Sequence, residues 1–488
     1  MPANLHRPLT ALITAFAITA ALSGAAVGTE LSADGGFAAT PYRSPGCESD
    51  LGLLNQVSGW QTAWPREWMR AATLGPQEQR DAIERWKEAP DAIAATTRSL
   101  RASIGTNRVA PKPVVRRVLQ QVDGISEALA TKAVPASEEG SAWQLFVEES
   151  LRPALDAYRE LLRDAYLPAT NDRLDLATLT GNDRCYAEAI EWWTSLDLTS
   201  AEVEAIGRTQ LDDTLVDLQS TLGDDESLDE LLAAFRSGEA FGKVERRDIV
   251  TVSEEAIQRA QAAAGDWFER GFSAPIVVEA IPAQLEDSVP AGFYRAGSPG
   301  TYAVNLSRPS SRRAMAEVIA FHEAVPGHHL QFSYAEANGS FSAGFAEGWA
   351  IYAEYLADEM GLFSSTRDRQ GMMTKHLWSA SRLIVEPGLQ AHGWTREQAI
   401  AFMLDNTALA RAEIEIEVDR YIAMPGQSLS YTLGYAYLQN LRDHAEDALA
   451  EAFSIRQFHD VVLDGGMRPL DTVAQDVRAW IERISAGS

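Results

Sequence analysis

The amino-acid sequence predicts a mainly α-helical protein with one small antiparallel β-hairpin, and three features of the chain support this expectation. From about residue 48 to 265, apolar residues recur at three- and four-residue spacing among charged residues, as in amphipathic helices. From about 275 to 306 the pattern changes to short β-rich stretches around a Gly-Ser-Pro-Gly turn at residues 297–300. After Ser310 the helical pattern returns and continues to the C-terminus.

Individual segments justify these expectations. The helical spacing is clear in Gln77–Lys87 and Pro113–Val122, and in Thr199–Gln219, where Thr199 or Ser200 followed by Glu202 is typical of a helix start. The β-rich stretches, which we interpret as the small hairpin, are 276–278, 293–295 and 301–304. The breaks expected in the later helical part are near Pro326, Gly361, Pro387 and Pro425-Gly426.

The charge of the chain excludes some classes of partner. Its 488 residues include 69 acidic and 42 basic side chains, which gives a net charge of −27. Nucleic acids require a basic binding face, and anionic membranes attract basic segments. We therefore expect neither nucleic acid nor a membrane surface as a partner of the mature protein. The sequence does not indicate an oligomeric state.

The N-terminus has the pattern of a signal peptide. His6 and Arg7 precede an apolar run, Leu9–Leu22, and small residues follow at 23–26. A transmembrane anchor is the alternative, but the run is shorter than the roughly 20 residues that a membrane span requires. We expect export to the periplasm or the extracellular space. The predicted organisation is a signal peptide at 1–26, a flexible linker at 27–46 and one helical domain at 47–488, undivided or in two lobes around a cleft.

The chain has only two cysteines, Cys47 and Cys185, and both lie in the part that is exported. In an oxidising compartment such a pair predicts one disulfide bond, which would connect the mature N-terminus to a helix far along the chain. Two unrelated buried thiols are the alternative, because spacing does not establish proximity.

A cluster of histidines indicates a metal site. Three of the eight histidines lie within residues 321–329, Phe-His-Glu-Ala-Val-Pro-Gly-His-His, at the end of a helix with an apolar face. Burial of so many polar groups is costly without compensation. Zn²⁺ accepts imidazole nitrogens and a carboxylate and leaves a position open for water. A carboxylate beside the first ligand, here Glu323, can act as general base on that water.

The spacing departs from the H-E-x-x-H motif, because Pro326 stands where that motif has its second histidine. Proline removes a helical hydrogen bond and clashes with the carbonyl four residues earlier, so the helix must bulge or kink. Two residues looped out would place His328 where a ligand four residues after His322 would lie. We therefore predict His322 and His328 as ligands, with His329 supporting the site or contacting substrate. The alternative is that His329 is the ligand.

The third ligand is predicted to be Glu347, in the segment Phe-Ala-Glu-Gly-Trp-Ala-Ile-Tyr-Ala-Glu at 345–354. Glu354 lies on the same helix face, and an exposed acidic stripe is the alternative reading of both. The apolar neighbours of Glu347 favour a ligand, whereas Glu354 is expected beside the site or at the surface. Gly348 within a helix costs roughly 1 kcal/mol relative to alanine and suggests the close approach of another element.

These two motifs together resemble the bacterial domain-of-unknown-function 885 family, whose pattern is H-E-x-x-P-G-H-H followed by A-E-G-W-A-x-Y-x-E. Further matches are found at 393–399, 417–421 and 425–431, and the resemblance extends from about residue 95 to the C-terminus. It implies a large helical zincin-like fold, related to oligopeptidases and carboxypeptidases, and a peptidase activity.

One segment departs from the family pattern. Where the family has Asp-Thr-Gly-x-His, this chain has Glu386-Pro-Gly-Leu-Gln390, so that an amide replaces an imidazole. Altered specificity or reduced activity would follow if that histidine contacts the metal or the substrate.

Two further residues have candidate roles. Tyr431 follows the Pro425-Gly426 break and could stabilise an oxyanion, with a hydrogen-bonded core tyrosine as the alternative. Arg420 could hold the C-terminal carboxylate of a substrate, with an ion pair to Glu417 or Glu413 as the alternative.

The sequence thus predicts a secreted zinc metallopeptidase that acts on oligopeptides, of carboxypeptidase or oligopeptidase type. The first alternative is a zinc hydrolase of another amide or ester. The second is a secreted binding protein that has lost activity on the same scaffold, although an intact Glu323 argues against it because a structural zinc site needs no general base.

Overall fold

The computed structural model describes residues 46–47, 49–62, 64, 76–106, 108–131, 138–270, 274–281, 283, 286, 291–334 and 341–487. The predicted signal peptide at 1–26 lies outside the described residues, as does the predicted linker apart from Gly46. In the described part, no helix has the length and apolar character that crossing a membrane requires.

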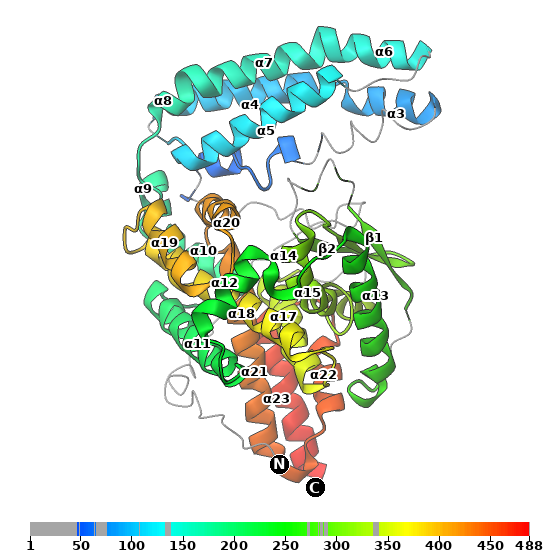
Figure 1. Cartoon of the computed structure of the whole chain (residues 1–488). Coiled ribbons are helices and arrows are strands. Elements are labelled where there is room, and N and C mark those ends of the chain that lie inside the picture. The colour runs from blue at the N-terminus through cyan, green and yellow to red at the C-terminus, as the bar shows by residue number, and fades with distance from the viewer. Residues whose placement is uncertain are drawn as a thin grey trace.

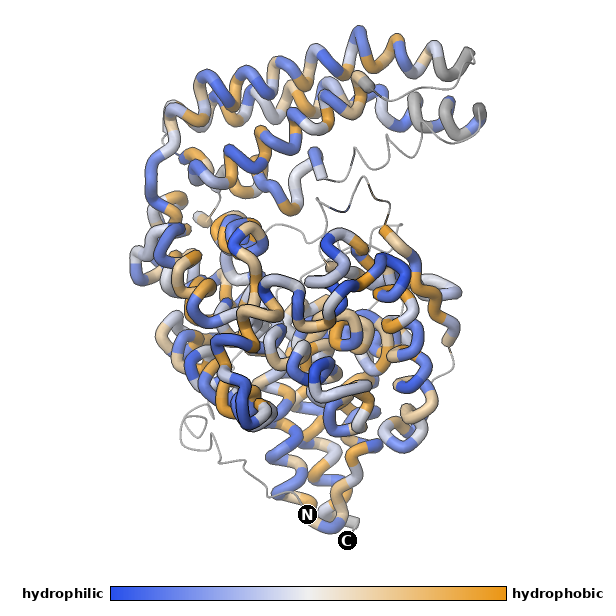
Figure 2. Tube along the Cα trace, viewed as in Figure 1, coloured by the Kyte–Doolittle hydropathy of each residue, from blue (hydrophilic) through white to orange (hydrophobic). Residues whose placement is uncertain are grey.

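The fold is mainly helical, as predicted, and its first helices form a layer at the top of Figure 1. Figure 2 shows apolar and polar residues alternating along these helices, so that each can bury one face against its neighbours. The helices of this layer are α3 (Pro76–Trp86), α4 (Ala89–Ile104), α5 (Lys112–Thr131), α6 (Glu138–Phe146), α7 (Arg152–Leu161) and α8 (Leu167–Ala169). Two π-helical turns, Val147–Leu151 and Leu162–Tyr166, join α6, α7 and α8.

Below this layer lies a helical body with the small sheet on one side (Figure 1). Its helices before the sheet are α9 (Leu176–Thr180), α10 (Cys185–Thr194), α11 (Ser200–Ser220), α12 (Leu228–Ser237) and α13 (Arg246–Ala263). The helices after the sheet are α14 (Pro309–Ala314), α15 (Ala316–Glu323), α16 (His328–Ser333), α17 (Ala343–Glu359), α18 (Thr366–Gln390), α19 (Arg396–Asn406), α20 (Arg411–Ala423), α21 (Ser430–Leu449), α22 (Ile455–Leu463) and α23 (Leu470–Gly487).

The buried hydrophobic side chains form two large clusters. One joins helices of the upper layer to α19 and α20, and the other lies among α11–α17 and α21–α23. Helix α18 contributes to both, with Leu377 and Ile384 in the second cluster and Val385 and Leu389 in the first. This long helix therefore connects the two cores.

The sheet has three strands in the order β1-β3-β2. Strands β2 (Gly292–Arg295) and β3 (Gly300–Val304) are antiparallel, which confirms the predicted hairpin. Strand β1 (Ile276–Ala280) pairs with β3 in parallel, which was not predicted. Parallel strands need a longer crossover connection, and the residue pattern does not specify which neighbour such a strand chooses.

A disulfide bond joins Cys47 to Cys185, the first residue of α10, across 138 positions of sequence. The Cα atoms lie 5.4 Å apart, within the range normal for disulfides. The bond predicted from the cysteine count is thus present, and it is consistent with an exported protein.

Helices α17 and α21 cross at glycines. A Cβ atom built on Gly434 would lie 1.9 Å from the carbonyl oxygen of Gly344 and 2.7 Å from the Cα atom of Gly348. A Cβ atom on Gly348 would in turn lie 2.5 Å from the Gly434 backbone. The close approach predicted from Gly348 is therefore made by α21, and it places α21 directly against the helix that carries Glu347.

We predict that Gly434→Ala lowers the free energy of unfolding by about 1–3 kcal/mol or more, because the added methyl group meets backbone that cannot move independently. Gly124→Ala in α5 is the matched control. A Cβ there would meet nothing within 4 Å, and we expect a gain of about 0.5–1 kcal/mol. Chemical unfolding of both variants measures this. Equal stabilities for the two variants would contradict the tight crossing.

Candidate metal centre

Helix α15 brings His322 and Glu323 to the site and then ends in an irregular break. The amide of Ala324 still donates to the carbonyl of Ala320, four residues back (2.9 Å). The next bonds reach six residues back, from Gly327 to Phe321 (2.9 Å) and from Leu330 to Ala324 (3.3 Å). Since a regular α-helix uses a four-residue step, two extra residues are accommodated here. This confirms the bulge predicted from Pro326.

Gly327 is required by this break. A Cβ atom at this position would lie 1.9 Å from the carbonyl oxygen of His322 and 2.4 Å from that of Phe321. The indole of Trp349 donates a hydrogen bond to the carbonyl of Pro326 (3.0 Å), which attaches α17 to the break. The bulge and the helix that carries Glu347 are therefore fixed relative to each other.

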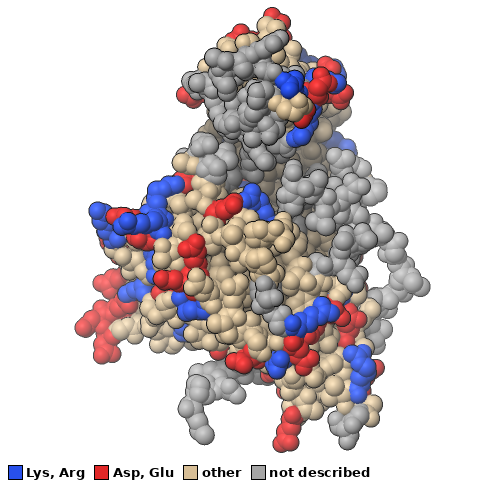
Figure 3. All heavy atoms as spheres, turned by 90° about the vertical axis from the view of Figure 1, so that its right-hand side faces the viewer, with Lys and Arg blue, Asp and Glu red and all other residues tan. Residues whose placement is uncertain are grey.

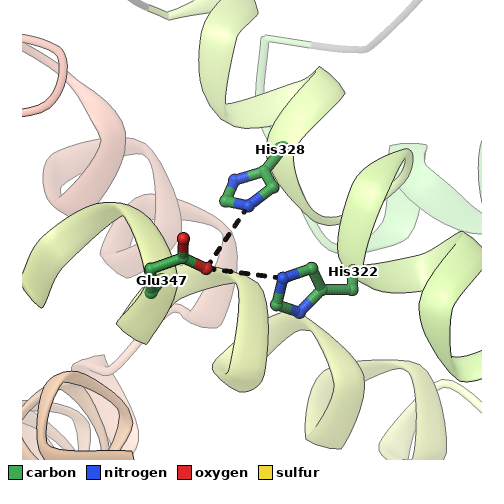
Figure 4. A group of neighbouring side chains, drawn as sticks. All are labelled: His322, His328 and Glu347. Carbon is green, nitrogen blue, oxygen red and sulfur yellow. Dashed lines mark ion pairs between the residues drawn. The ribbon is translucent and has the colours of Figure 1, made fainter. Parts of the chain in front are cut away.

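His322, His328 and Glu347 converge at one point (Figure 4). The carboxylate oxygen Oε2 of Glu347 lies 3.5 Å from Nε2 of His322 and 3.7 Å from Nε2 of His328. The possible ligand atoms of all three residues lie within 4.8 Å of one another. Both histidines are buried, and Glu347 keeps 21% of its side chain exposed. The predicted ligand set is thus brought together in the structure.

The other nitrogen of each histidine is occupied by an oxygen acceptor. His322 Nδ1 lies 2.6 Å from Oε1 of the fully buried Glu354. His328 Nδ1 lies 3.2 Å from the side-chain oxygen of Gln331. Because Nδ1–H donates to these oxygens, both Nε2 lone pairs face the site, as metal-binding histidines require. Glu354 therefore lies behind His322, a candidate ligand, which is one of the two locations expected from the sequence.

Glu354 is held in turn by α18. Lys375 Nζ donates to its Oε1 (2.5 Å), and His376 Nε2 bonds its Oε2 (2.8 Å). All three side chains are buried, so the carboxylate charge is compensated inside the protein. Burial raises the pKa of Glu354, but Lys375 and the two histidines lower it well below its usual range overall.

The carboxylates around His322 favour a positive charge, either a proton or a metal ion, at its Nε2 atom. Burial and Lys375 lower the pKa of His322, but Glu347, Glu354 and Glu323 raise it to about 9 overall. Burial raises the pKa of Glu347, but the nearby His322 and His328 hold it well below its usual range overall. The site therefore attracts positive charge, which a proton or a metal ion can supply.

The donor set fits zinc. Tetrahedral Zn²⁺ with bonds near 2.1 Å places its ligand atoms about 3.4 Å apart, close to the separations of Glu347 from both histidines. Two imidazoles and one carboxylate leave one position open, which is the arrangement of catalytic rather than structural zinc sites.

Comparison of the whole sequence with models of known families identifies the family of this chain. A family model described as "bacterial protein of unknown function (DUF885)" matches residues 11–477. The chain belongs to the DUF885 family. No curated protein is significantly similar to it in sequence.

Two solved structures share the DUF885 fold seen here. A "putative lipoprotein" from Colwellia psychrerythraea is 22% identical with a TM-score of 0.77, over 88% of this chain and 81% of that chain. A "putative lipoprotein of unknown function" from Shewanella oneidensis is 17% identical with a TM-score of 0.65, over 88% of this chain and 83% of that chain. At these identities the similarity concerns the fold alone.

Glu323, the predicted general base, is buried next to His322. No hydrogen bond or ion pair joins its carboxylate to another group among the described residues of this DUF885 protein. It therefore differs from Glu354, whose oxygens are occupied by Lys375 and two histidines. An unoccupied carboxylate beside a ligand is available to a water molecule.

Tyr431, the predicted oxyanion-stabilising residue, lies in the first turn of α21. Its ring is nearly parallel to that of His322, with the ring centres 6.3 Å apart. Burial and the nearby Glu347 charge raise the pKa of its phenol, which therefore stays protonated as a hydrogen-bond donor. The structure thus places Tyr431 near the ligands.

His329 is turned away from the three ligands. Its Nδ1 lies 2.9 Å from the hydroxyl of Tyr294 in β2, and its Nε2 lies 3.1 Å from the carbonyl of Ala274. Burial lowers its pKa, consistent with a neutral ring that donates one bond and accepts the other. His329 thus connects α16 to the sheet, and its predicted contact with substrate stays a prediction.

Arg420 forms the ion pair that was the alternative to its predicted role. Its Nη2 donates to Glu417 (2.6 Å) and its Nη1 to Gln427 (2.6 Å). Its proposed contact with a substrate carboxylate stays a prediction.

Two of the residues that depart from the DUF885 pattern, Glu386 and Gln390, form hydrogen bonds within the structure. The fully buried Glu386 accepts hydrogen bonds from the Gly426 amide (2.5 Å) and the Ser428 hydroxyl, in the loop that leads into α21. Gln390 accepts a hydrogen bond from the Leu176 amide (2.8 Å). Glu386 therefore fixes the loop immediately before Tyr431.

Three residues of the site were not assigned a role from the sequence: Gln331, Lys375 and His376. Gln331 is three residues after His328, a helical spacing that could have identified it. The segment Lys375-His376 gives no comparable signal, because only the packing of α18 against α17 brings it to Glu354.

We predict that His328→Ala loses bound zinc whereas His329→Ala retains it, because of these two histidines only His328 directs a nitrogen at Glu347. Metal analysis of the purified, zinc-loaded variants measures the difference. A zinc-loaded His328→Ala beside a zinc-free His329→Ala would reverse the ligand assignment.

We also predict a stability effect from Glu386. Burial raises its pKa to about 7, against the opposing effect of its hydrogen bonds. A carboxyl group with a raised pKa favours the folded state below its unfolded pKa of about 4.5, and this contribution is lost as the pH rises towards 7. Between pH 5 and 8 the loss amounts to about 2–3 kcal/mol.

The Glu386→Gln variant should lack this loss, so its unfolding free energy should change less between pH 5 and 8 than that of the wild type. Urea unfolding at both pH values, in the presence of a chelator, measures the change. An identical pH dependence in the two proteins would rule out this contribution.

Proposed function

We propose that this DUF885 protein is an exported zinc-dependent metallopeptidase that hydrolyses peptide bonds of oligopeptides. One observation carries the proposal: two histidine Nε2 atoms and a carboxylate converge next to a second carboxylate, Glu323, whose charge acts on His322 and which has no hydrogen bond or ion pair among the described residues. A purely structural metal site would have no use for that second carboxylate.

His322, His328 and Glu347 would hold the ion. Zinc, when bound there, supplies a Lewis acid that lowers the pKa of a water molecule and polarises a carbonyl group. Glu323 takes a proton from the attacking water and passes it to the leaving amine. The carbon–nitrogen bond breaks, and one water yields a carboxylic acid and an amine. The Tyr431 hydroxyl donates a hydrogen bond to the oxygen that gains negative charge.

Two features support export. The disulfide Cys47–Cys185 is typical of proteins of oxidising compartments. The two solved structures with the same fold are described as "putative lipoproteins", a class of exported proteins. The apolar N-terminal segment predicts a cleaved signal peptide, which would direct this protein to the periplasm or outside the cell.

The surface charge supports a peptide rather than a nucleic acid as partner. The face in Figure 3 has acidic and basic side chains interspersed, and the whole chain has a net charge of −27. A phosphate backbone would require a continuous basic surface instead. A zinc hydrolase of another amide or ester is the second candidate, because the metal chemistry does not specify the acyl group. A binding protein without activity is the third.

We predict that Glu323→Gln lowers kcat by at least about 10²–10⁴-fold while zinc content and folding stay normal, because the residue acts on water and does not hold the metal. A peptide library is first digested with the zinc-loaded protein, and mass spectrometry identifies the peptides that are cleaved. One of these peptides then serves as the substrate for measuring kcat. Glu255→Gln, at an exposed position on α13, is the control and should keep full activity. A Glu323→Gln variant that retains most of its activity would contradict the assigned mechanism.

A further inference from the structure

Beside the metal centre lies a pair of arginines that share a single carboxylate. Arg382 on α18 and Arg420 on α20 both donate to Oε2 of Glu417, at 3.3 Å and 2.6 Å. Two other carboxylates nearby are directed elsewhere, since Glu347 faces His322 and His328, and Glu386 bonds the loop before α21. The arginine pair therefore has a formal excess of positive charge inside a protein with a net charge of −27.

The guanidinium of Arg382 packs against two aromatic rings, but only two of its three nitrogens form hydrogen bonds among the described residues. Its carbon lies 4.3 Å from the centre of the Trp378 ring and 4.5 Å from that of the Tyr431 ring. Its Nε donates to the hydroxyl of Tyr421 (3.3 Å), and its Nη2 donates to Glu417. Its third nitrogen, Nη1, has no hydrogen-bond partner among the described residues, although the side chain is only 6% exposed.

Such an arginine is ready to accept an anionic ligand. Guanidinium has five N–H donors in one plane, and those of Nη1 are left over after the bonds to Tyr421 and Glu417. Aromatic contacts and a buried ion pair fix this plane before any ligand arrives, so little conformational entropy is lost on binding. Carboxylates are the anions that match this planar geometry best among groups carried by peptides.

The position of Arg382 relative to the metal ligands indicates which carboxylate it meets. Tyr431 is the neighbour of both, with its ring 4.5 Å from the guanidinium of Arg382 and 6.3 Å from the ring of His322. Successive residues of a peptide are about 3.8 Å apart, so the terminal carboxylate of the last one or two residues lies about 4–8 Å beyond the scissile bond. A C-terminal carboxylate is thus within the range of Arg382.

We infer that Arg382 binds the C-terminal carboxylate of the substrate, so that the protein is a carboxypeptidase that releases one or two residues from a free C-terminus. This inference rests on the proposed function. It assigns the substrate carboxylate to Arg382, with Arg420 sharing Glu417 behind it. An internal peptide segment would instead place an uncharged chain against a buried cation, which is unfavourable.

The test compares N-blocked tripeptides with a free C-terminal acid and with a C-terminal amide, using the zinc-loaded full-length protein. We expect kcat/KM for the acid to exceed that for the amide by at least about 10²-fold. Arg382→Gln should lower kcat/KM for the acid by about 10²-fold, mainly through KM, and bring the acid-to-amide ratio close to one. Arg246→Gln removes an arginine that pairs with Glu286 away from the site and should change neither value.

Binding provides a second measurement that does not depend on turnover. Titration of the peptide acid and amide into zinc-loaded Glu323→Gln protein should show preference for the acid, and Arg382→Gln in that background should remove the preference. If Arg382→Gln does not fold, the preference for acid over amide is measured in Arg382→Lys and in the wild type instead. These two measurements then test the carboxylate assignment.

The outcomes separate the two proposals. Equal hydrolysis of acid and amide by the wild type, or an acid preference that survives in Arg382→Gln, overturns the carboxylate assignment and leaves the peptidase intact. Hydrolysis of neither peptide by fully zinc-loaded protein, with no binding to the Glu323→Gln variant, overturns the peptidase proposal and this inference with it.

Discussion

The site depends on one local constraint, the two-residue bulge that follows Glu323. Without it, His322 and His328 would lie six residues apart on a regular helix and point to different sides. Pro326 cannot make the regular helical hydrogen bond and disrupts the helix here, and Gly327 allows the backbone to approach the carbonyls of Phe321 and His322. Helix α17 is attached to this bulge through Trp349 and brings Glu347 to the two imidazoles. The ligand geometry is thus a property of the backbone as much as of the side chains.

A second layer of contacts stabilises the buried charged groups behind His322. The ionised Glu354 lies at the centre, bonded to His322 on one side and to Lys375 and His376 on the other. Burying such a carboxylate without partners would cost several kcal/mol. Lys375 and His376 come from α18, which also contributes to both hydrophobic cores and carries Arg382 and Glu386. One helix therefore links the upper layer, the support of His322 and the loop that positions Tyr431.

Much of the site could be predicted from sequence because local rules were sufficient. Pro326 indicated that the helix would be interrupted, and the ligand preferences of zinc selected His322, His328 and Glu347, which the structure brings together. The glycine at 348 predicted a close helix crossing, and the cysteine pair predicted the disulfide. These inferences need only the residue types and their spacing along a short segment.

The remaining features depend on tertiary packing and had no local signal. The parallel pairing of β1 depends on a crossover of the chain, and the assembly of Lys375, His376 and Glu354 depends on how α18 packs against α17. The two bonds of His329, to Tyr294 and Ala274, likewise depend on where the sheet lies. For Arg420 two roles were open from the sequence, and the observed ion pair with Glu417 is the one that a short helical spacing favours.

The most direct test of the account is the position of the metal. Crystals grown with zinc, measured at the zinc absorption edge, should show one anomalous peak about 2.0–2.2 Å from Nε2 of His322, Nε2 of His328 and a carboxylate oxygen of Glu347. The ring of His329 should remain bonded to Tyr294 and Ala274. A peak coordinated by His329, or no bound zinc at this cluster in a folded protein, would contradict the account.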